Sequence, residues 1–304
     1  MLLAVFMFSF GDATGKFIVA TYSVGQLLWL RACAALLLLA PLIWRNRNSF
    51  AKIEQPRLQF VRVLLSTSEV ASFFLSTSYL PLTDVVTYYL ACPIFVTALS
   101  AIVLREPVGR RRWTAILVGF VGVLIALRPS AQTFSWSALI ALNGSFSFAG
   151  LMLTTRQLRQ TPDVVIVTLQ FIGSFLLGAL LAPFGWLTPT PRSLFLFAAA
   201  GMISVCALVC ISRSLKLAPA SAVAPYQYSQ IFWAVIFGFV AFGDVPSPAT
   251  LAGAVIIIGA GLYIFLRERK LRLDEFRLRP QDLAVTGQTQ NTQPASKGVS
   301  DRPD

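Results

Sequence analysis

The sequence predicts an all-α membrane protein with ten transmembrane helices, built as two inverted five-helix repeats. Three observations predict this fold class. The chain is 56% hydrophobic and only 12% charged, with a mean hydropathy of +0.71, whereas soluble domains are roughly 25% charged. Apolar runs recur along most of its length, and its two halves share residues at a constant offset. A chain this apolar requires the bilayer as its solvent.

The apolar runs define the expected helices. A helix that crosses a membrane needs about 20 mostly apolar residues, and the segments between the runs contain Gly, Pro, Ser or clustered Arg, which end helices. The tail from about residue 271 is polar and has little to bury, so we expect it to be disordered. The expected spans are 2–21, 24–44, 61–80, 84–104, 113–128, 134–153, 163–183, 193–214, 220–242 and 250–266.

The distribution of basic residues predicts the orientation. With a cytoplasmic N-terminus, 21 of the 25 Lys and Arg residues, Arg62 among them, fall in inner segments or the tail. The outer segments hold only Lys16, Arg128 and Arg192, and Arg31 lies within a helix. Cytoplasmic loops of membrane proteins carry such an excess of Lys and Arg. We therefore expect both termini in the cytoplasm, and we attribute the net charge of +12 to topology, with no nucleic-acid partner.

An internal repeat is visible at a shift of 138 residues. Each match is weak alone, but several at one shift indicate that residues 1–130 and 131–268 are related, with 269–304 as a separate tail. The matches are Phe8-Ser9-Phe10 with Phe146-Ser147-Phe148, Ser66 with Ser204, Ser76 with Ser214, Pro81 with Pro219, Tyr88 with Tyr226 and Glu106 with Asp244.

The second repeat is expected to be upside down, because five helices per repeat is an odd number. The charges agree: Glu106 is followed by three arginines, Arg110 to Arg112, whereas Asp244 is followed by no basic residue in its loop. Inverted repeats are the architecture of many secondary transporters, whose site lies near the membrane midplane between the repeats.

The sequence resembles the EamA family of the drug/metabolite transporter superfamily over residues 1–268. The resemblance lies in Tyr79-Leu80-Pro81-Leu82-Thr83-Asp84, Pro93, Leu104-Arg105-Glu106-Pro107-Val108-Gly109, Gly119, Gly122 and Arg128-Pro129, with a looser copy through Leu217-Ala218-Pro219-Ala220 and Asp244. It implies ten helices, a bacterial inner membrane and transport of a small molecule without an ATPase subunit. Through Phe8-Ser9-Phe10-Gly11-Asp12-Ala13 and the region from Gly15-Lys16 to Arg31, the chain looks most like the bacterial riboflavin uptake transporters. Related branches import S-adenosylmethionine or export amino acids or drugs.

Other classes of protein fit the sequence less well. We find no Walker A motif and no nucleotide fingerprint after a strand, and the chain has no histidine, so we expect no metal, no cofactor and no enzymatic activity. An intramembrane enzyme would need clustered acid or His residues at a membrane face, and a channel or receptor would show no saturable counterflow. The expected function is a carrier working by alternating access, with riboflavin as the first substrate to test. Import of S-adenosylmethionine and export of amino acids are the alternatives.

Ionisable residues inside the spans are candidates for the transport site, because charges are costly there. Asp12 and Lys16 lie four residues apart, which permits a helical salt bridge or contacts with substrate or protons. Arg31 could pair with Glu69 or Asp12, or extend to the membrane surface. Glu69, among several serines, is the main candidate for a proton-linked or substrate-binding carboxylate; the alternative is a paired structural carboxylate.

Polar and aromatic residues on other spans are further candidates for substrate binding. Aromatic rings suit a flat ring system and amides suit its polar edges, although tyrosines also anchor helices at the interface. Hydroxyl and amide side chains can instead join helices, and Gly119, Gly122, Gly259 and Gly261 favour helix packing or a homodimer. The polar and aromatic candidates are Tyr88, Tyr89, Tyr226, Gln227, Gln230, Asn143, Ser66 and Ser204.

Overall fold

A computed structural model of the chain divides it into two units, residues 1–264 and 265–304, and the description below concerns the first. The expected tail, Gln227 and Glu106 lie outside the described residues. All regular structure in the described part is helical, as predicted. The residues described are 2–51, 55–103, 110–127, 136–217, 226, 228–263 and 266–267.

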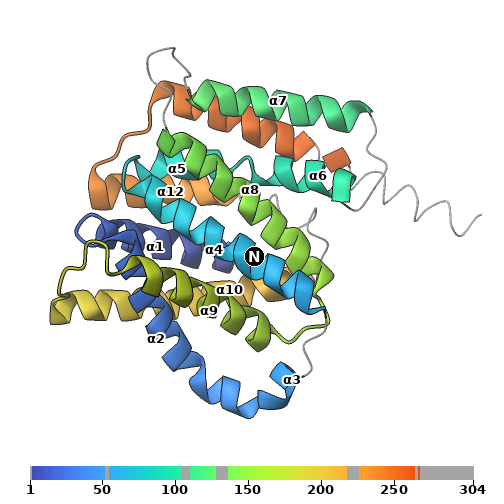
Figure 1. Ribbon diagram of the computed structural model, residues 1–304. Helices are drawn as coiled ribbons and strands as arrows, with labels where there is room; N and C mark the ends of the chain where they lie inside the picture. The colour runs from blue at the N-terminus through green and yellow to red at the C-terminus, as the bar shows by residue number, and fades with distance from the viewer. Residues whose placement is uncertain are drawn as a thin grey trace, which may run out of the picture. The chain divides into compact units, whose positions relative to one another are not determined.

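The helices follow the expected runs closely (Figure 1). Their bounds are α1 (Leu2–Val19), α2 (Val24–Arg45), α3 (Arg47–Ala51), α4 (Pro56–Thr77), α5 (Leu82–Tyr89), α6 (Cys92–Val103), α7 (Arg110–Leu127), α8 (Trp136–Gln157), α9 (Asp163–Leu181), α10 (Pro191–Leu217), α12 (Ser229–Phe242) and a final helix, Pro248–Tyr263.

Seven segments within the described residues are long and apolar enough to cross a membrane. Three shorter apolar helices, Trp113–Ile125, Ser229–Phe242 and Pro248–Tyr263, accompany them. The expectation of a multi-pass helical membrane protein is thus confirmed at the level of fold class.

The span expected over 84–104 is interrupted near its middle. α5 ends at Tyr89 and α6 begins at Cys92. Pro93 explains the break, because proline has no N–H and its ring clashes with the carbonyl four residues earlier, here that of Tyr89. The chain tightens at this point, and the Ala91 N–H donates to the Tyr88 carbonyl at 3.1 Å.

The third expected span begins earlier than predicted, at Pro56 instead of residue 61. Proline is favoured in the first turn of a helix, where its missing N–H has no partner to lose, and Gln55 before it adopts a left-handed backbone with φ of 53°. Arg62, which fell at the start of the span expected over 61–80, lies about two turns inside α4 and is 2% exposed. It is therefore a buried residue of the helix.

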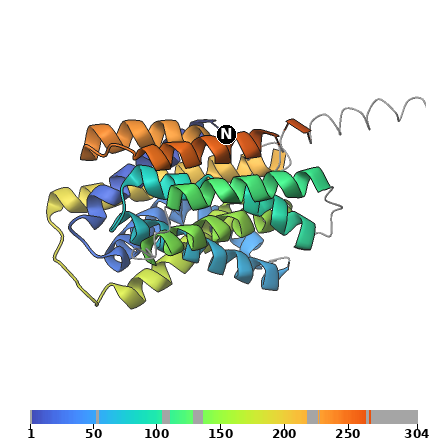
Figure 2. The same cartoon turned by 90° about the horizontal axis from the view of Figure 1, so that it is seen from above.

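The long helices of unit 1 run along a common direction and pack in pairs (Figures 1 and 2). α2 lies against α9, α4 against α8, and α1 against α10. Small residues permit this closeness: a Cβ added at Gly178 of α9 would overlap the backbone of Trp29 on α2. Gly122 of α7 likewise lies against Ile256 of the final helix, so this glycine serves packing within the chain.

Candidate functional site

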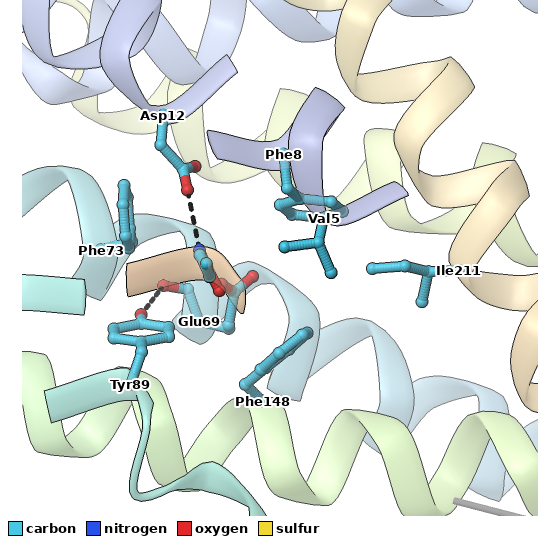
Figure 3. A pocket seen from close by; sticks show the side chains of 9 residues that line it. Val5, Phe8, Asp12, Glu69, Phe73, Tyr89, Phe148 and Ile211 are labelled. Atoms are coloured by element: carbon cyan, nitrogen blue, oxygen red, sulfur yellow. Dashed lines mark hydrogen bonds between the residues drawn. The ribbon is translucent and has the colours of Figure 1, made fainter. Parts of the chain in front are cut away.

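A small cavity lies where six helices meet, and its lining combines two acids with four aromatic rings (Figure 3). α1, α4 and α5 line it from the first half of the chain, and α8, α10 and α12 from the second. Its volume is about 20 Å³, which is room for a single water molecule. The lining residues are Val5, Phe8, Asp12, Glu69, Phe73, Tyr89, Phe148, Ile211 and Gln230.

Asp12 projects from the middle of α1 into this cavity and is buried. Its Oδ2 accepts a hydrogen bond from Gln230 Nε2 of α12 at 3.1 Å, drawn as a dashed line in Figure 3. One neutral amide donor leaves most of the carboxylate's acceptor capacity unused. Asp12 can therefore accept hydrogen bonds or bind a cation without first breaking an ion pair.

Glu69 lies on the cavity wall at the middle of α4 and is 6% exposed. Within the described part of the chain, its carboxylate has neither a hydrogen-bond partner nor an ion pair within 4 Å. A buried carboxylate is costly unless it is paired or protonated. The position of Glu69 therefore suits a group that exchanges protons or meets a positive charge on a ligand.

Tyr89 is held at the break between α5 and α6. The Tyr89 hydroxyl donates to the Glu69 backbone carbonyl at 3.1 Å, and this bond fixes the orientation of the tyrosine ring. Because the acceptor is the backbone oxygen, the Glu69 carboxylate is not engaged by Tyr89. Its ring packs edge-on against Phe73, with centroids 5.2 Å apart. Gly144 of α8 makes room for the hydroxyl, because a Cβ there would overlap it.

Arg31 of α2 was the expected partner of these two acids. It forms no ion pair with Asp12 or Glu69 within 4 Å. Its Nη1 donates weakly to Ser204 Oγ at 3.4 Å, and its guanidinium lies 5.1 Å from the centre of the Phe74 ring. Its Nε has no partner among the described residues. Arg31 therefore contributes positive charge to the region, and the expected direct pairing does not occur.

The spacing of four residues had suggested a salt bridge between Asp12 and Lys16, but Lys16 pairs with a different acid. The Lys16 Nζ lies 2.5 Å from Asp244 Oδ2, beyond the end of α12. Asp244 Oδ2 also accepts from the backbone N–H of Leu82, the first residue of α5, at 3.3 Å. The sequence could not reveal this contact, because a residue 228 positions away competes with the local one.

The remaining predicted residues lie outside this cavity. Asn143 donates to Ser68 Oγ at 3.2 Å and Ser72 Oγ at 3.0 Å, which joins α8 to α4. Ser66 donates to a carbonyl of its own helix. Tyr88 is buried in the hydrophobic core, and Tyr226 is 48% exposed. The structure thus brings together Asp12, Glu69, Tyr89 and Gln230, and leaves the other described candidates apart.

A second cavity shares Phe8, Glu69, Phe148 and Ile211 with the first and has a similar volume of about 20 Å³. Its distinct polar residues are Arg62, Thr155, Gln170 and Ser212. Sequence reasoning did not select Arg62 or Gln170 as site residues. Arg62 fell at the start of the span expected over 61–80, but it was counted with the basic residues of the inner segments and not weighed as a buried charge.

These helices and this buried polar centre define a class of protein, a multi-pass helical membrane protein with acidic groups in its interior. The chain belongs to the EamA-like transporter family, which matches residues 1–128 and 135–266. The family and the relatives described below are transporters, not enzymes, and place the protein in the bacterial inner membrane.

Two curated relatives and one solved structure illustrate the similarity. The "S-adenosylmethionine uptake transporter" of Rickettsia bellii is 26% identical and covers 88% of this chain and 93% of its own. The "Riboflavin transporter" of Vibrio cholerae is 30% identical over 69% of this chain and 72% of its own. A protein of known crystal structure matches with a TM-score of 0.59 and 14% identity, over 88% of this chain and 98% of its own, which concerns the fold alone.

Proposed function

We propose that this protein is a secondary carrier that moves a small cationic or zwitterionic metabolite by alternating access between two inverted repeats of five helices. The observation that carries the proposal is the pair of buried acids, Asp12 and Glu69, in an aromatic cavity lined by both halves of the chain. Transporters built from repeats place the substrate between the repeats, near the membrane midplane.

The two-repeat architecture is supported by the positions of the helices. Adding the shift of 138 to Arg110, the first residue of α7, gives Pro248, the first residue of the final helix. Adding it to Cys92, where α6 begins, gives residue 230, one beyond the start of α12 at Ser229. Related helices thus begin at equivalent positions.

The packing of the helices supports the same relation. The shift relates α1 to α8 and α4 to α10. It therefore exchanges the pair α4 and α8 with the pair α10 and α1, and both pairs are in contact. A pseudo-two-fold axis between the two halves would produce this exchange. Equivalent loops of the two halves differ in their content of basic residues, which favours repeats of opposite orientation in the membrane.

The chemistry of the cavity separates the substrate candidates. Two carboxylates within apolar walls favour a positively charged group, which S-adenosylmethionine carries as a sulfonium. Riboflavin has no positive charge, and only the rings of Phe8, Phe73, Tyr89 and Phe148 favour its flat ring system. We therefore place S-adenosylmethionine ahead of riboflavin, which reverses the order that the sequence had suggested.

Counterflow in proteoliposomes tests this function. Purified protein is reconstituted in vesicles loaded with unlabelled S-adenosylmethionine or riboflavin, and uptake of the same labelled compound is followed. We expect saturable counterflow of labelled S-adenosylmethionine that needs no ATP. Counterflow of riboflavin alone would overturn the substrate order, and flux that never saturates would indicate a channel.

A further inference from the structure

Arg62 is a buried cation whose protein partners are all neutral. Its Nε donates to Thr155 Oγ1 at 2.9 Å, its Nη1 to the Ile166 carbonyl at 3.1 Å and its Nη2 to Gln170 Oε1 at 3.0 Å. A guanidinium has five N–H donors, so two have no partner in the described part of the chain. Three neutral bonds hold the guanidinium in one orientation without neutralising its charge.

The nearby acid at this end of the bundle is already engaged. Asp163 Oδ1 lies 2.6 Å from Lys216 Nζ, and Asp163 Oδ2 lies 3.4 Å from Arg213 Nε. No carboxylate among the described residues lies within 4 Å of the Arg62 guanidinium. A buried charge without a counter-charge is unfavourable, and an anionic group on a ligand would remove that cost.

Arg62 and Glu69 line one cavity from the same helix. They are seven residues apart on α4, about two turns and about 10 Å along the helix axis. Seven residues also return to nearly the same face of a helix. Glu69 lines both cavities, with Asp12 in the first and with Arg62 in the second. The second cavity therefore adds a positive charge about two helical turns from Glu69.

We propose that Arg62 binds the carboxylate of a zwitterionic substrate whose cationic group lies at Asp12 and Glu69. This inference rests on the proposed function and deepens it, because it names the anionic half of the ligand and the residue that recognises it. The remaining N–H groups of Arg62 supply charge-assisted hydrogen bonds to that carboxylate. Gln170 and Thr155 position the guanidinium and do not themselves need to touch the ligand.

A matched pair of ligands tests the role of Arg62. S-adenosylmethionine and its decarboxylated derivative share the sulfonium and the adenosine and differ in the carboxylate. Each competes for uptake of labelled S-adenosylmethionine into proteoliposomes. Charge-assisted hydrogen bonds contribute about 1.5–3 kcal/mol, so the wild-type protein should bind the decarboxylated compound roughly tenfold to a hundredfold more weakly.

Two variants connect this preference to Arg62. Gln170→Glu keeps the shape of the side chain but supplies a protein carboxylate to Arg62, so it should weaken competition by S-adenosylmethionine and bring the two ligands close to equal. Arg62→Gln should do the same if it folds, which thermal unfolding of the purified variant checks. Gln157→Glu adds the same charge at an exposed position on α8 and should leave the preference unchanged.

The possible results distinguish a failure of the proposed role of Arg62 from a failure of the proposed carrier function. Equal competition by the two ligands in the wild-type protein, or an unchanged preference in folded Gln170→Glu and Arg62→Gln, would overturn the role of Arg62 and leave the carrier intact. Uptake of riboflavin without uptake of S-adenosylmethionine would likewise refute a zwitterionic substrate but not a carrier. Absence of saturable counterflow for every compound would instead contradict the proposed function.

Discussion

At the scale of single residues, the central feature is a set of buried charges that the protein leaves incompletely paired. Glu69 has no polar partner for its carboxylate within the described residues, Asp12 has one amide, and Arg62 has three neutral acceptors. Burial of such groups opposes stability. Apolar side chains at these positions would be more stabilising, so the presence of the charged groups points to use by a ligand or proton.

Replacing Glu69 by Gln tests that use. If the ionised Glu69 attracts a cationic substrate, wild-type uptake falls as the pH is lowered and the carboxylate is protonated. The Gln variant should show uptake reduced by at least about tenfold and a flatter pH profile, with the residual slope due to Asp12. Initial uptake rates in proteoliposomes between acidic and neutral pH measure this.

Asp84→Asn is the control for this variant. Asp84 accepts a hydrogen bond from Thr250 Oγ1 at 2.8 Å and does not line the cavity, so neutralising it should leave the pH profile in place. A Glu69→Gln protein with wild-type uptake and a wild-type pH profile would remove Glu69 from the site.

The placement of Tyr89 can be tested through the glycine that accommodates it. Gly144→Val would force the Tyr89 hydroxyl away from the Glu69 carbonyl, and overpacking of this kind costs about 1–3 kcal/mol. We expect lower thermal stability and reduced uptake. Gly259→Ala is the matched control, because a Cβ there meets nothing within 4 Å, and alanine favours a helix by up to about 1 kcal/mol. Equal thermal stability and equal uptake in the two variants would contradict the close packing of Tyr89 against Gly144.

At the scale of elements, ion pairs tie helix ends from different parts of the chain. Lys16 of α1 meets Asp244, which follows α12 and also binds the first N–H of α5. Lys216 of α10 meets Asp163 at the start of α9. These contacts fix the ends of helices that lie far apart in the sequence against one another.

A double-mutant cycle tests the first of these contacts. Lys16→Met and Asp244→Asn are made singly and together, and thermal unfolding in detergent gives the three changes in stability. Because the two side chains are only 13% and 21% exposed, we expect a coupling of about 1 kcal/mol. Additive changes would mean that the two residues do not interact in the protein.

At the scale of the whole molecule, the feature to test is the number of membrane crossings. Seven segments meet the length and apolarity expected of a span, while the proposed repeats require ten. The three further helices that the repeats require are Trp113–Ile125, Ser229–Phe242 and Pro248–Tyr263, which are apolar but shorter than the other spans. The segment across the break at Pro93, Leu82–Ser100, is already one of the seven.

Reporter fusions at the two ends decide between the counts. An even number of crossings places both termini on one side, and an odd number places them on opposite sides. Green fluorescent protein, active in the cytoplasm, and alkaline phosphatase, active in the periplasm, are fused in turn to each end of the full chain. We expect fluorescence from both termini. Phosphatase activity at one end alone would contradict the ten-helix proposal, and phosphatase activity at both ends would contradict the expected cytoplasmic orientation.

Most of the helical framework could be predicted from the sequence because its signal is local. Apolar runs of about 20 residues separated by breakers identify helices without any knowledge of their neighbours. The same reasoning found Glu69, Asp12 and Gln230, since a polar group in an apolar run is conspicuous. It did not single out Arg62, because a charge near the end of an apolar run was counted with the basic residues that mark the cytoplasmic side.

The sequence by itself determined the membrane class, the helical content, the family resemblance and the identity of the buried acids, all of which depend on composition and local pattern. Only the tertiary structure decided which polar groups meet. It joined Lys16 to Asp244 in place of Asp12, Asp12 to Gln230, and Arg62 to Gln170. These partners lie on helices far apart in the chain, and helix packing, not sequence spacing, sets the distances between them.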